Sequence, residues 1–253
     1  MVDWTDEGIV LAARPHGEGS AVVTLLTQVH GRHAGLVRGA FSGRARGVYQ
    51  PGNRINAEWR ARLVEHLGNY TGELIVGHAA AVLHDPLKLA GLSAACAVAD
   101  TSLPEREPHP RVHDGLVALL DVMAMEEVGD AWIAAYVSWE IGLLADLGYG
   151  LDLDACAATG NNDDLAYVSP RSGRAVSLAA GEPYRDKLLR LPRFLISDGG
   201  GDPDDLFAGL ALSGFFLERH VFATHNRHPP PSRTRFVERF AQGTTLSGGG
   251  PLE

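Results

Sequence analysis

The sequence lacks the features of a secreted or membrane-spanning protein. It has two cysteines, Cys96 and Cys156, far apart in a chain of 253 residues, and with no secretory signal this argues against a disulfide framework. No apolar run approaches the roughly 18 residues that a membrane-spanning helix needs. The short apolar run 9–13 follows acidic residues and not the basic stretch of a signal peptide. We therefore expect a cytoplasmic protein with no membrane partner.

Catalytic and metal-binding motifs are also missing. The chain contains no Gly-x-Ser-x-Gly elbow, no phosphate loop, no complete dinucleotide fingerprint and no HExxH or CxxC pattern. His109 and His113 have the spacing of a metal pair, and His220, His225 and His228 form a cluster. A zinc site would need further ligands brought to either group. We expect no enzyme activity, no cofactor and no metal.

Charge is distributed unevenly along the chain. The net charge is −9, yet residues 32–62 hold seven arginines against one acidic residue, Glu58. Residues 63–253 hold 14 basic and 26 acidic residues. Such asymmetry is typical of a surface that binds a charged partner. The alternative is a solvated face whose arginines pair with acids from elsewhere, and composition alone leaves both open.

Residues 4–79 have the pattern of strands. Short β-branched runs at 8–14, 20–28, 34–39 and 70–78 are separated by glycine-bearing turns. The clearest strand follows Gly52, where apolar residues from Ile55 to Leu63 alternate with polar ones. Five strands in this length predict a small barrel, for which the OB-fold is the best-known arrangement.

After residue 79 the apolar period changes from that of strands to that of helices. Helical stripes cover 89–103, 112–123, 132–147 and 206–217. The acidic run Asp202, Asp204 and Asp205 is interpreted as the N-terminal cap of a helix beginning near Pro203. The predicted fold class is α+β, with domains 1–80 (barrel) and 81–241 (helical, with a loop-rich insertion at 148–203), then a disordered tail, 242–253.

The basic segment suggests a nucleic-acid interface. Arginine donors match phosphate geometry, and an aromatic ring offers a base a stacking surface. Trp59 points to the apolar side of its strand and is assigned to the core, so Tyr49 is the stacking candidate, with Phe41 close by in the same loop. The candidate DNA-binding residues are Arg32, Arg38, Arg44, Arg46, Tyr49, Arg54, Arg60 and Arg62.

Several short stretches, in their order along the chain, resemble the RecO family of recombination mediators. They are Glu7-Gly8-Ile9-Val10-Leu11, Gly17-Glu18-x-Ser20, Thr27-x-x-His30-Gly31, Gln50-Pro51-Gly52, Leu147-Gly148-Tyr149 and Pro231-Ser232-Arg233. The resemblance covers about residues 1–240. It implies an N-terminal OB-fold, a helical domain and a cytoplasmic, nucleoid-associated protein.

The resemblance also implies partners. Such a protein binds single- and double-stranded DNA, anneals complementary strands and, with RecR, helps RecA replace single-strand-binding protein. The helical domain is then expected to capture the acidic C-terminal tail of single-strand-binding protein. The candidates for this contact are Arg219, Arg227, Arg233 and Arg235, with the edge 106–123 as a weaker one. The alternative is that the apolar residues of 218–239 are core and the arginines cap helices.

The chain departs from the family at a zinc site. Many members carry two CxxC pairs after the Leu-Gly-Tyr segment, and here the first is reduced to Cys156-Ala157-Ala158-Thr159. The region of the second, residues 172–177, has no cysteine. One thiolate cannot make a four-ligand site, so we carry over no metal and expect residues 148–181 to be a degenerate zinc loop.

Two other functions remain open from the sequence. The basic barrel could dock an acidic protein partner, which would make the chain a non-catalytic interaction module. Alternatively, an unrecognised hydrolase or transferase site could lie in the loop-rich region 148–203.

Overall fold

The computed structural model describes residues 1–43, 45–197 and 201–247, except for the side chains of residue 225 and residues 245–247. These residues form two compact units. The first consists of Met1–Glu126 and Pro230–Arg239, and the second of Glu127–Pro229 and the chain from Phe240 onward. The sequence analysis placed the boundary between its two domains at residue 80, where the apolar period changes. That boundary stays a prediction.

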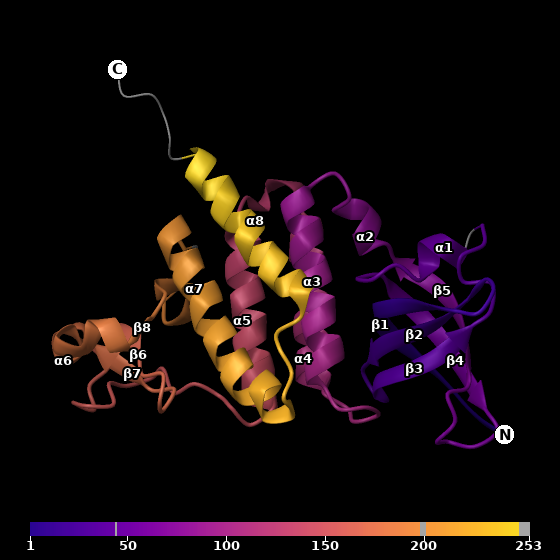
Figure 1. Ribbon diagram of the computed structural model, residues 1–253, viewed down its shortest axis with the longest axis horizontal. Helices are drawn as coiled ribbons and strands as arrows, with labels where there is room; N and C mark the ends of the chain where they lie inside the picture. Colours follow the sequence, from indigo (N-terminus) through magenta and orange to yellow (C-terminus); the bar gives the residue numbers. More distant parts are fainter. Residues whose placement is uncertain (44, 198–200, 248–253) are drawn as a thin grey trace. The chain divides into compact units, whose positions relative to one another are not determined.

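The first unit begins with a five-stranded barrel (Figure 1). Its strands follow the order β1-β2-β3-β5-β4 around the barrel. All pairings are antiparallel except β3 with β5, which is parallel and limited to Leu36 and Asn69. The predicted α+β class with an N-terminal five-stranded barrel is confirmed. The strands are β1 Val2–His16, β2 Ser20–Thr27, β3 Gly31–Val37, β4 Arg54–Ala61 and β5 Asn69–Val76.

Strand β1 is longer than the run 8–14 that the sequence predicted. Its first half pairs with β4 and its second half with β2. A change of register between Val10 and Ala12 marks a bulge, and a bulge bends a strand. Because one strand serves two neighbours in this way, the polar residues of 2–7 take part in the barrel although they carry little strand signal.

The barrel interior is filled as the alternation in β4 predicted. Ile55, Ala57 and Trp59 are buried, and the residues between them face outward. Trp59 therefore belongs to the core, as expected. Its indole also donates a hydrogen bond to the Leu67 carbonyl, 2.9 Å away, which satisfies the one polar group that this buried ring carries.

Helices complete the first unit and are tied to the barrel by partly buried polar contacts. Asp100 of α3 pairs with Arg14 of β1 at 2.5 Å and with Arg32 of β3 at 3.5 Å. The His78 ring contacts the Gly52 carbonyl at 3.1 Å and Asp121 of α4 at 2.7 Å. The described helices are α1 Ala45–Val48, α2 His78–Ala81, α3 Pro86–Ser102, α4 Pro110–Ala124 and the first part of α8 Pro231–Ser247.

The second unit contains helices and a small sheet. The Asp202 side chain accepts a hydrogen bond from Asp205 N at 2.8 Å and Pro203 begins α7, so the acidic run is a helix cap as predicted. Helix α7 is buried on most sides and continues as a π-helical turn over Leu217–Phe222. The elements are α5 Ala131–Asp146, β6 Leu165–Val168, β7 Ala175–Ser177, α6 Leu178–Gly181, β8 Leu189–Arg190 and α7 Pro203–Phe216.

Two further segments differ from the prediction. The expected loop-rich insertion holds the three-stranded sheet β7-β6-β8, whose strands of two to four residues are too short to show a period. Helix α8, Pro231–Ser247, was not predicted from the sequence. Its last residues, 242–247, are helical where the sequence predicted a disordered tail. The rest of that tail lies outside the described residues. Among the described helices, none has the length and apolar character needed to cross a membrane.

Candidate nucleic-acid interface

The seven arginines of 32–62 have different environments, and Arg32 is a structural anchor. Its Nε donates to the Leu103 carbonyl at 2.8 Å, and its guanidinium lies near Asp100 and Glu105 at 3.5 and 3.4 Å. These three acceptors use most of its donors. The Arg32 side chain is therefore already committed to α3 and the residues that follow it, and it is poorly placed to bind phosphate.

Two arginines of strand β4 lie on its outward face among carboxylates. Arg54 lies 3.9 Å from Glu7, and Arg60 lies 3.5 Å from Glu58. Asp3 of β1 is the register partner of Arg60. The outward face of β4 therefore carries both signs of charge. Acidic residues from 1–31 offset part of the positive charge of these arginines.

Three other arginines are exposed and have no ion pair within the described residues: Arg38, Arg46 and Arg62. Arg38 follows the end of β3, Arg46 lies in α1 and Arg62 follows β4. Arg44, the remaining candidate, lies outside the described residues. Unpaired exposed guanidinium groups keep all their donors available to phosphate oxygens.

Phe41 replaces Tyr49 as the candidate ring on which a base could stack. Tyr49 is 7% exposed and packs in the barrel core, where burial raises the pKa of its hydroxyl. A base cannot stack on a ring that is covered in this way. Phe41 is 42% exposed and, with Arg46 and Gln50, lines a pocket of about 110 Å³. Both rings lie in the same glycine-rich loop, so only their burial distinguishes them.

Asn53 organises this loop, and the sequence analysis did not single it out. Its buried side chain donates to the carbonyls of Gly47 and Val48 at 2.8 and 3.2 Å and accepts from Ala79 N at 3.1 Å. The amide therefore ties α1 to the start of α2. The signal was present in the sequence, because Asn53 directly follows the Gln50-Pro51-Gly52 turn.

A polar cluster inside the barrel includes His33. Its Nδ1 lies 2.8 Å from the Tyr70 hydroxyl, and its ring meets Trp4 and Trp59 edge to face. Burial lowers the pKa of His33 to about 4, with a further contribution from the charge of Arg106. His33 is therefore neutral at pH 7 and belongs to the core, although it lies in the basic segment.

The apolar residues expected beside the second group of candidate arginines are not exposed. Val221, Phe222 and Phe236 are buried, so they are core, which was the alternative explanation for them. Arg233 is buried as well. The three others are exposed: Arg219 and Arg227 belong to the second unit, and Arg235 to the first.

Comparisons with known proteins decide the family. The models named Recombination protein O N terminal and Recombination protein O C terminal match residues 1–77 and 83–229. The chain belongs to the RecO family. It is 56% identical over 249 residues to the DNA repair protein RecO of Rhodospirillum centenum, with 98% of each chain covered. To that of Phenylobacterium zucineum it is 50% identical over 246 residues, covering 97% of this chain and all of the relative. RecO membership supports a role in DNA repair.

In this RecO family member, hydrogen bonds link Cys156 to Ser177, within the segment that the sequence analysis expected to be a degenerate zinc loop. Ser177 N donates to the Cys156 sulfur at 3.2 Å, and Ser177 Oγ lies 3.4 Å from it. Hydrogen bonds from Ser177 and Thr159 lower the pKa of the Cys156 thiol to about 6. Within the described ranges, no three His, Cys, Asp or Glu side chains are placed to hold a metal ion.

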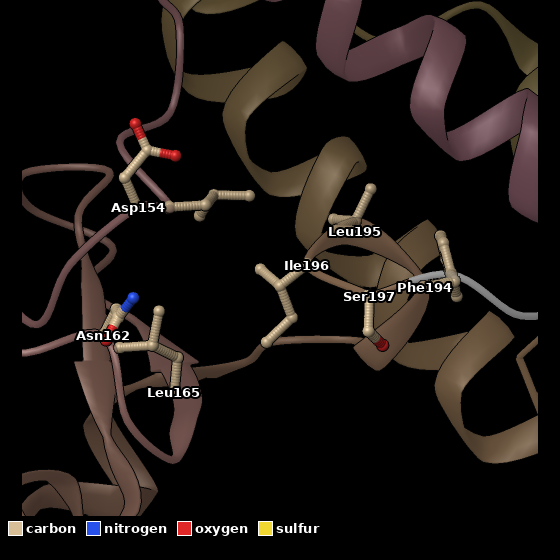
Figure 2. Close-up of a pocket in the computed structure, with 8 residues that line it drawn as sticks. Asp154, Asn162, Leu165, Phe194, Leu195, Ile196 and Ser197 are labelled. Carbon is tan, nitrogen blue, oxygen red and sulfur yellow. The ribbon is translucent and has the colours of Figure 1, made fainter.

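A pocket of about 560 Å³ lies in the second unit, between the 153–165 segment and residues 194–197 (Figure 2). Asp154 is its one charged lining residue among those described, so the pocket does not favour phosphate. The Ser197 hydroxyl donates to the Arg193 carbonyl at 3.0 Å and not to a base. This arrangement gives no support to a nucleophilic site in 148–203.

Proposed function

We propose that this protein is a non-catalytic mediator of recombinational DNA repair that binds single- and double-stranded DNA through its barrel. One observation carries the proposal. In a chain with a net charge of −9, the barrel keeps Arg38, Arg46 and Arg62 exposed and without acidic partners in the described part of the chain, with Phe41 exposed beside Arg46. RecO family membership supports the same function.

The chemistry of these residues suits a strand held by its backbone. Guanidinium groups bind phosphate oxygens through paired donors, and the Phe41 ring offers one face to a base. Neither contact depends on base sequence. A strand bound in this way keeps its base edges available, which is the condition for annealing to a complementary strand.

The proposal extends to partners. With RecR, the protein helps RecA replace single-strand-binding protein, whose acidic C-terminal tail it captures. Arg219 and Arg227, exposed in the second unit, are the better candidates for the tail. Arg233 is buried, so it is no longer proposed as part of this surface. Arg235 serves instead as an exposed position with which Arg233 is compared. Binding of a purified tail peptide measures this contact directly.

The barrel interface is tested by reversing the charge of its unpaired arginines. We expect Arg38→Glu/Arg46→Glu/Arg62→Glu to abolish binding of a single-stranded oligonucleotide near physiological salt. Wild-type affinity should fall steeply with salt, because each phosphate contact on a single strand contributes about 0.7 to the slope of log affinity against log salt. Phe41→Ala should weaken binding by about 1–3 kcal/mol, the usual contribution of one stacked base.

The matched control reverses three exposed arginines of the second unit, Arg171, Arg185 and Arg193. It changes the net charge equally, so normal binding by the control assigns the effect to the barrel. Normal binding by a folded barrel variant contradicts the proposal. The basic barrel would then be a docking site for an acidic protein.

A further inference from the structure

The loop between β4 and β5, residues 62–68 (the β4–β5 loop), exposes three large aliphatic side chains. Leu63, Val64 and Leu67 are 46%, 58% and 40% exposed. Single exposed apolar residues are common on protein surfaces, whereas a group of them marks a contact site. Three within one short loop therefore call for a partner.

The backbone of this loop is fixed by donors from three residues outside it. The Arg106 guanidinium donates to the carbonyls of Val64 and His66, the latter at 3.0 Å. Trp59 Nε1 donates to the Leu67 carbonyl at 2.9 Å, and Leu36 N donates to the Gly68 carbonyl at 3.0 Å. Because these carbonyls accept bonds from the protein, the loop is held in one conformation while its apolar side chains remain exposed.

The groups that hold the loop are themselves anchored. Arg106 has a positive φ of 61°, and its N–H donates to the Arg32 carbonyl at 2.8 Å. Gly68 also has a positive φ, 64°, and a Cβ there would lie 2.3 Å from Trp59 Nε1. Burying the aliphatic side chains in the barrel would break these contacts. Exposure of the loop is therefore built into the fold.

Charge and shape indicate which partner the loop fits. Arg62 begins the loop and has no ion pair within the described residues. Arg60, in the strand before it, is 64% exposed and lies 3.5 Å from Glu58. Glu65 is the single acidic residue of the loop. Aliphatic side chains beside arginines match a nucleic-acid strand, whose phosphates meet the arginines. Proteins insert such aliphatic wedges between bases and unstack them.

We propose that the β4–β5 loop is a wedge that inserts Leu63, Val64 and Leu67 between neighbouring bases of a bound strand. Arg62, which has no ion pair within the described residues, holds the phosphate beside them. This inference rests on the proposed DNA binding. It also links that binding to annealing, because unstacked bases are free to pair with a second strand. The rigid backbone lowers the entropic cost of insertion.

The test uses the full-length protein and a single-stranded oligonucleotide carrying 2-aminopurine, whose fluorescence rises when it is unstacked. We expect the wild type to raise the fluorescence and Leu63→Ser/Val64→Ser/Leu67→Ser to lose most of that rise. The salt slope of binding should stay unchanged, because the arginines remain. The control, Leu74→Ser/Ile75→Ser, replaces two exposed apolar side chains of β5, which are 47% and 40% exposed. It should behave as the wild type.

A second variant, Arg106→Gln, removes the anchor and keeps the aliphatic side chains. We expect a partial loss of the fluorescence rise at unchanged salt slope. If the wild type binds no DNA at any salt, the proposed function itself fails. If the triple variant binds and unstacks as the wild type does, the wedge is overturned. A triple variant that unstacks normally but no longer binds purified RecR would identify the loop as a protein-docking site and would also overturn the wedge.

Discussion

The two arginine-rich segments, 32–62 and 218–239, look alike in sequence and differ in the folded chain. Both interleave arginines with aromatic residues. In the first, Arg38, Arg46 and Arg62 are exposed beside an exposed Phe41. In the second, Arg219, Arg227, Arg235 and Arg239 are exposed, but Arg233 is buried and the aromatic residues are core, so neither phenylalanine ring is exposed among the arginines. A high local density of arginine therefore does not by itself specify a binding surface.

The secondary structure of each segment accounts for the difference. The exposed arginines of the first segment lie in turns, in the short α1 or at a strand end, where no packed face claims them. In α8, Arg233 precedes Phe236 and Phe240 by three and seven residues, so all three lie on one face of the helix. Both phenylalanines are buried, and Arg233 is buried with them.

The largest expected effect concerns the buried arginine. Arg233→Ala should lower the free energy of unfolding by about 3 kcal/mol or more, because it leaves the groups that this buried side chain contacts without their partner and removes the packing of its stem. Arg235→Ala, two positions away and exposed, should change it by less than about 0.5 kcal/mol. Urea denaturation measures both. Equal effects would mean that the two arginines have similar environments and would remove the contrast between the segments.

A second test concerns His33, a titratable group buried within the first segment. Its pKa is lowered from 6.5 to about 4 by burial, so between these values the unfolded chain binds a proton that the folded chain does not. The free energy of unfolding should therefore fall as the pH drops from about 6.5 to about 4, by roughly 3 kcal/mol in total. His33→Gln, which can still hydrogen-bond the Tyr70 hydroxyl, should lack this part of the pH dependence. Equal pH dependence of both proteins would show that His33 is not buried in its neutral form.

The smallest expected effect concerns the exposed arginines of the second segment. Arg219→Glu/Arg227→Glu should weaken binding of an acidic tail peptide about tenfold, or about 1.4 kcal/mol, by replacing attraction with repulsion. Arg38→Glu/Arg46→Glu makes the same charge change in the barrel and should leave peptide affinity nearly unaltered. If Arg38→Glu/Arg46→Glu caused the larger loss of peptide affinity, the tail would bind the first segment and not the second.

Much of the fold was predictable because it rests on short-range patterns. Alternation identified β4 and its buried Trp59, helical periods identified α3, α4, α5 and α7, and the acidic run before α7 identified its cap. The 17-residue helix α8 was not predicted. The short strands β6 to β8 were missed because two to four residues carry no measurable period. The first half of β1 was missed because its polar residues depend on pairing with β4, which is distant in sequence.

By itself, the sequence determined the family, the five-stranded barrel followed by helices, and the concentration of arginine in 32–62. Tertiary structure alone decided which of those residues are available. Arg32 is committed to Asp100 and Leu103, Tyr49 is covered and Phe41 is not. The same holds for the β4–β5 loop, whose exposure depends on Arg106, some 40 residues away. The physical reason is that burial and pairing are set by contacts between residues far apart in the chain, whereas sequence patterns report only on near neighbours.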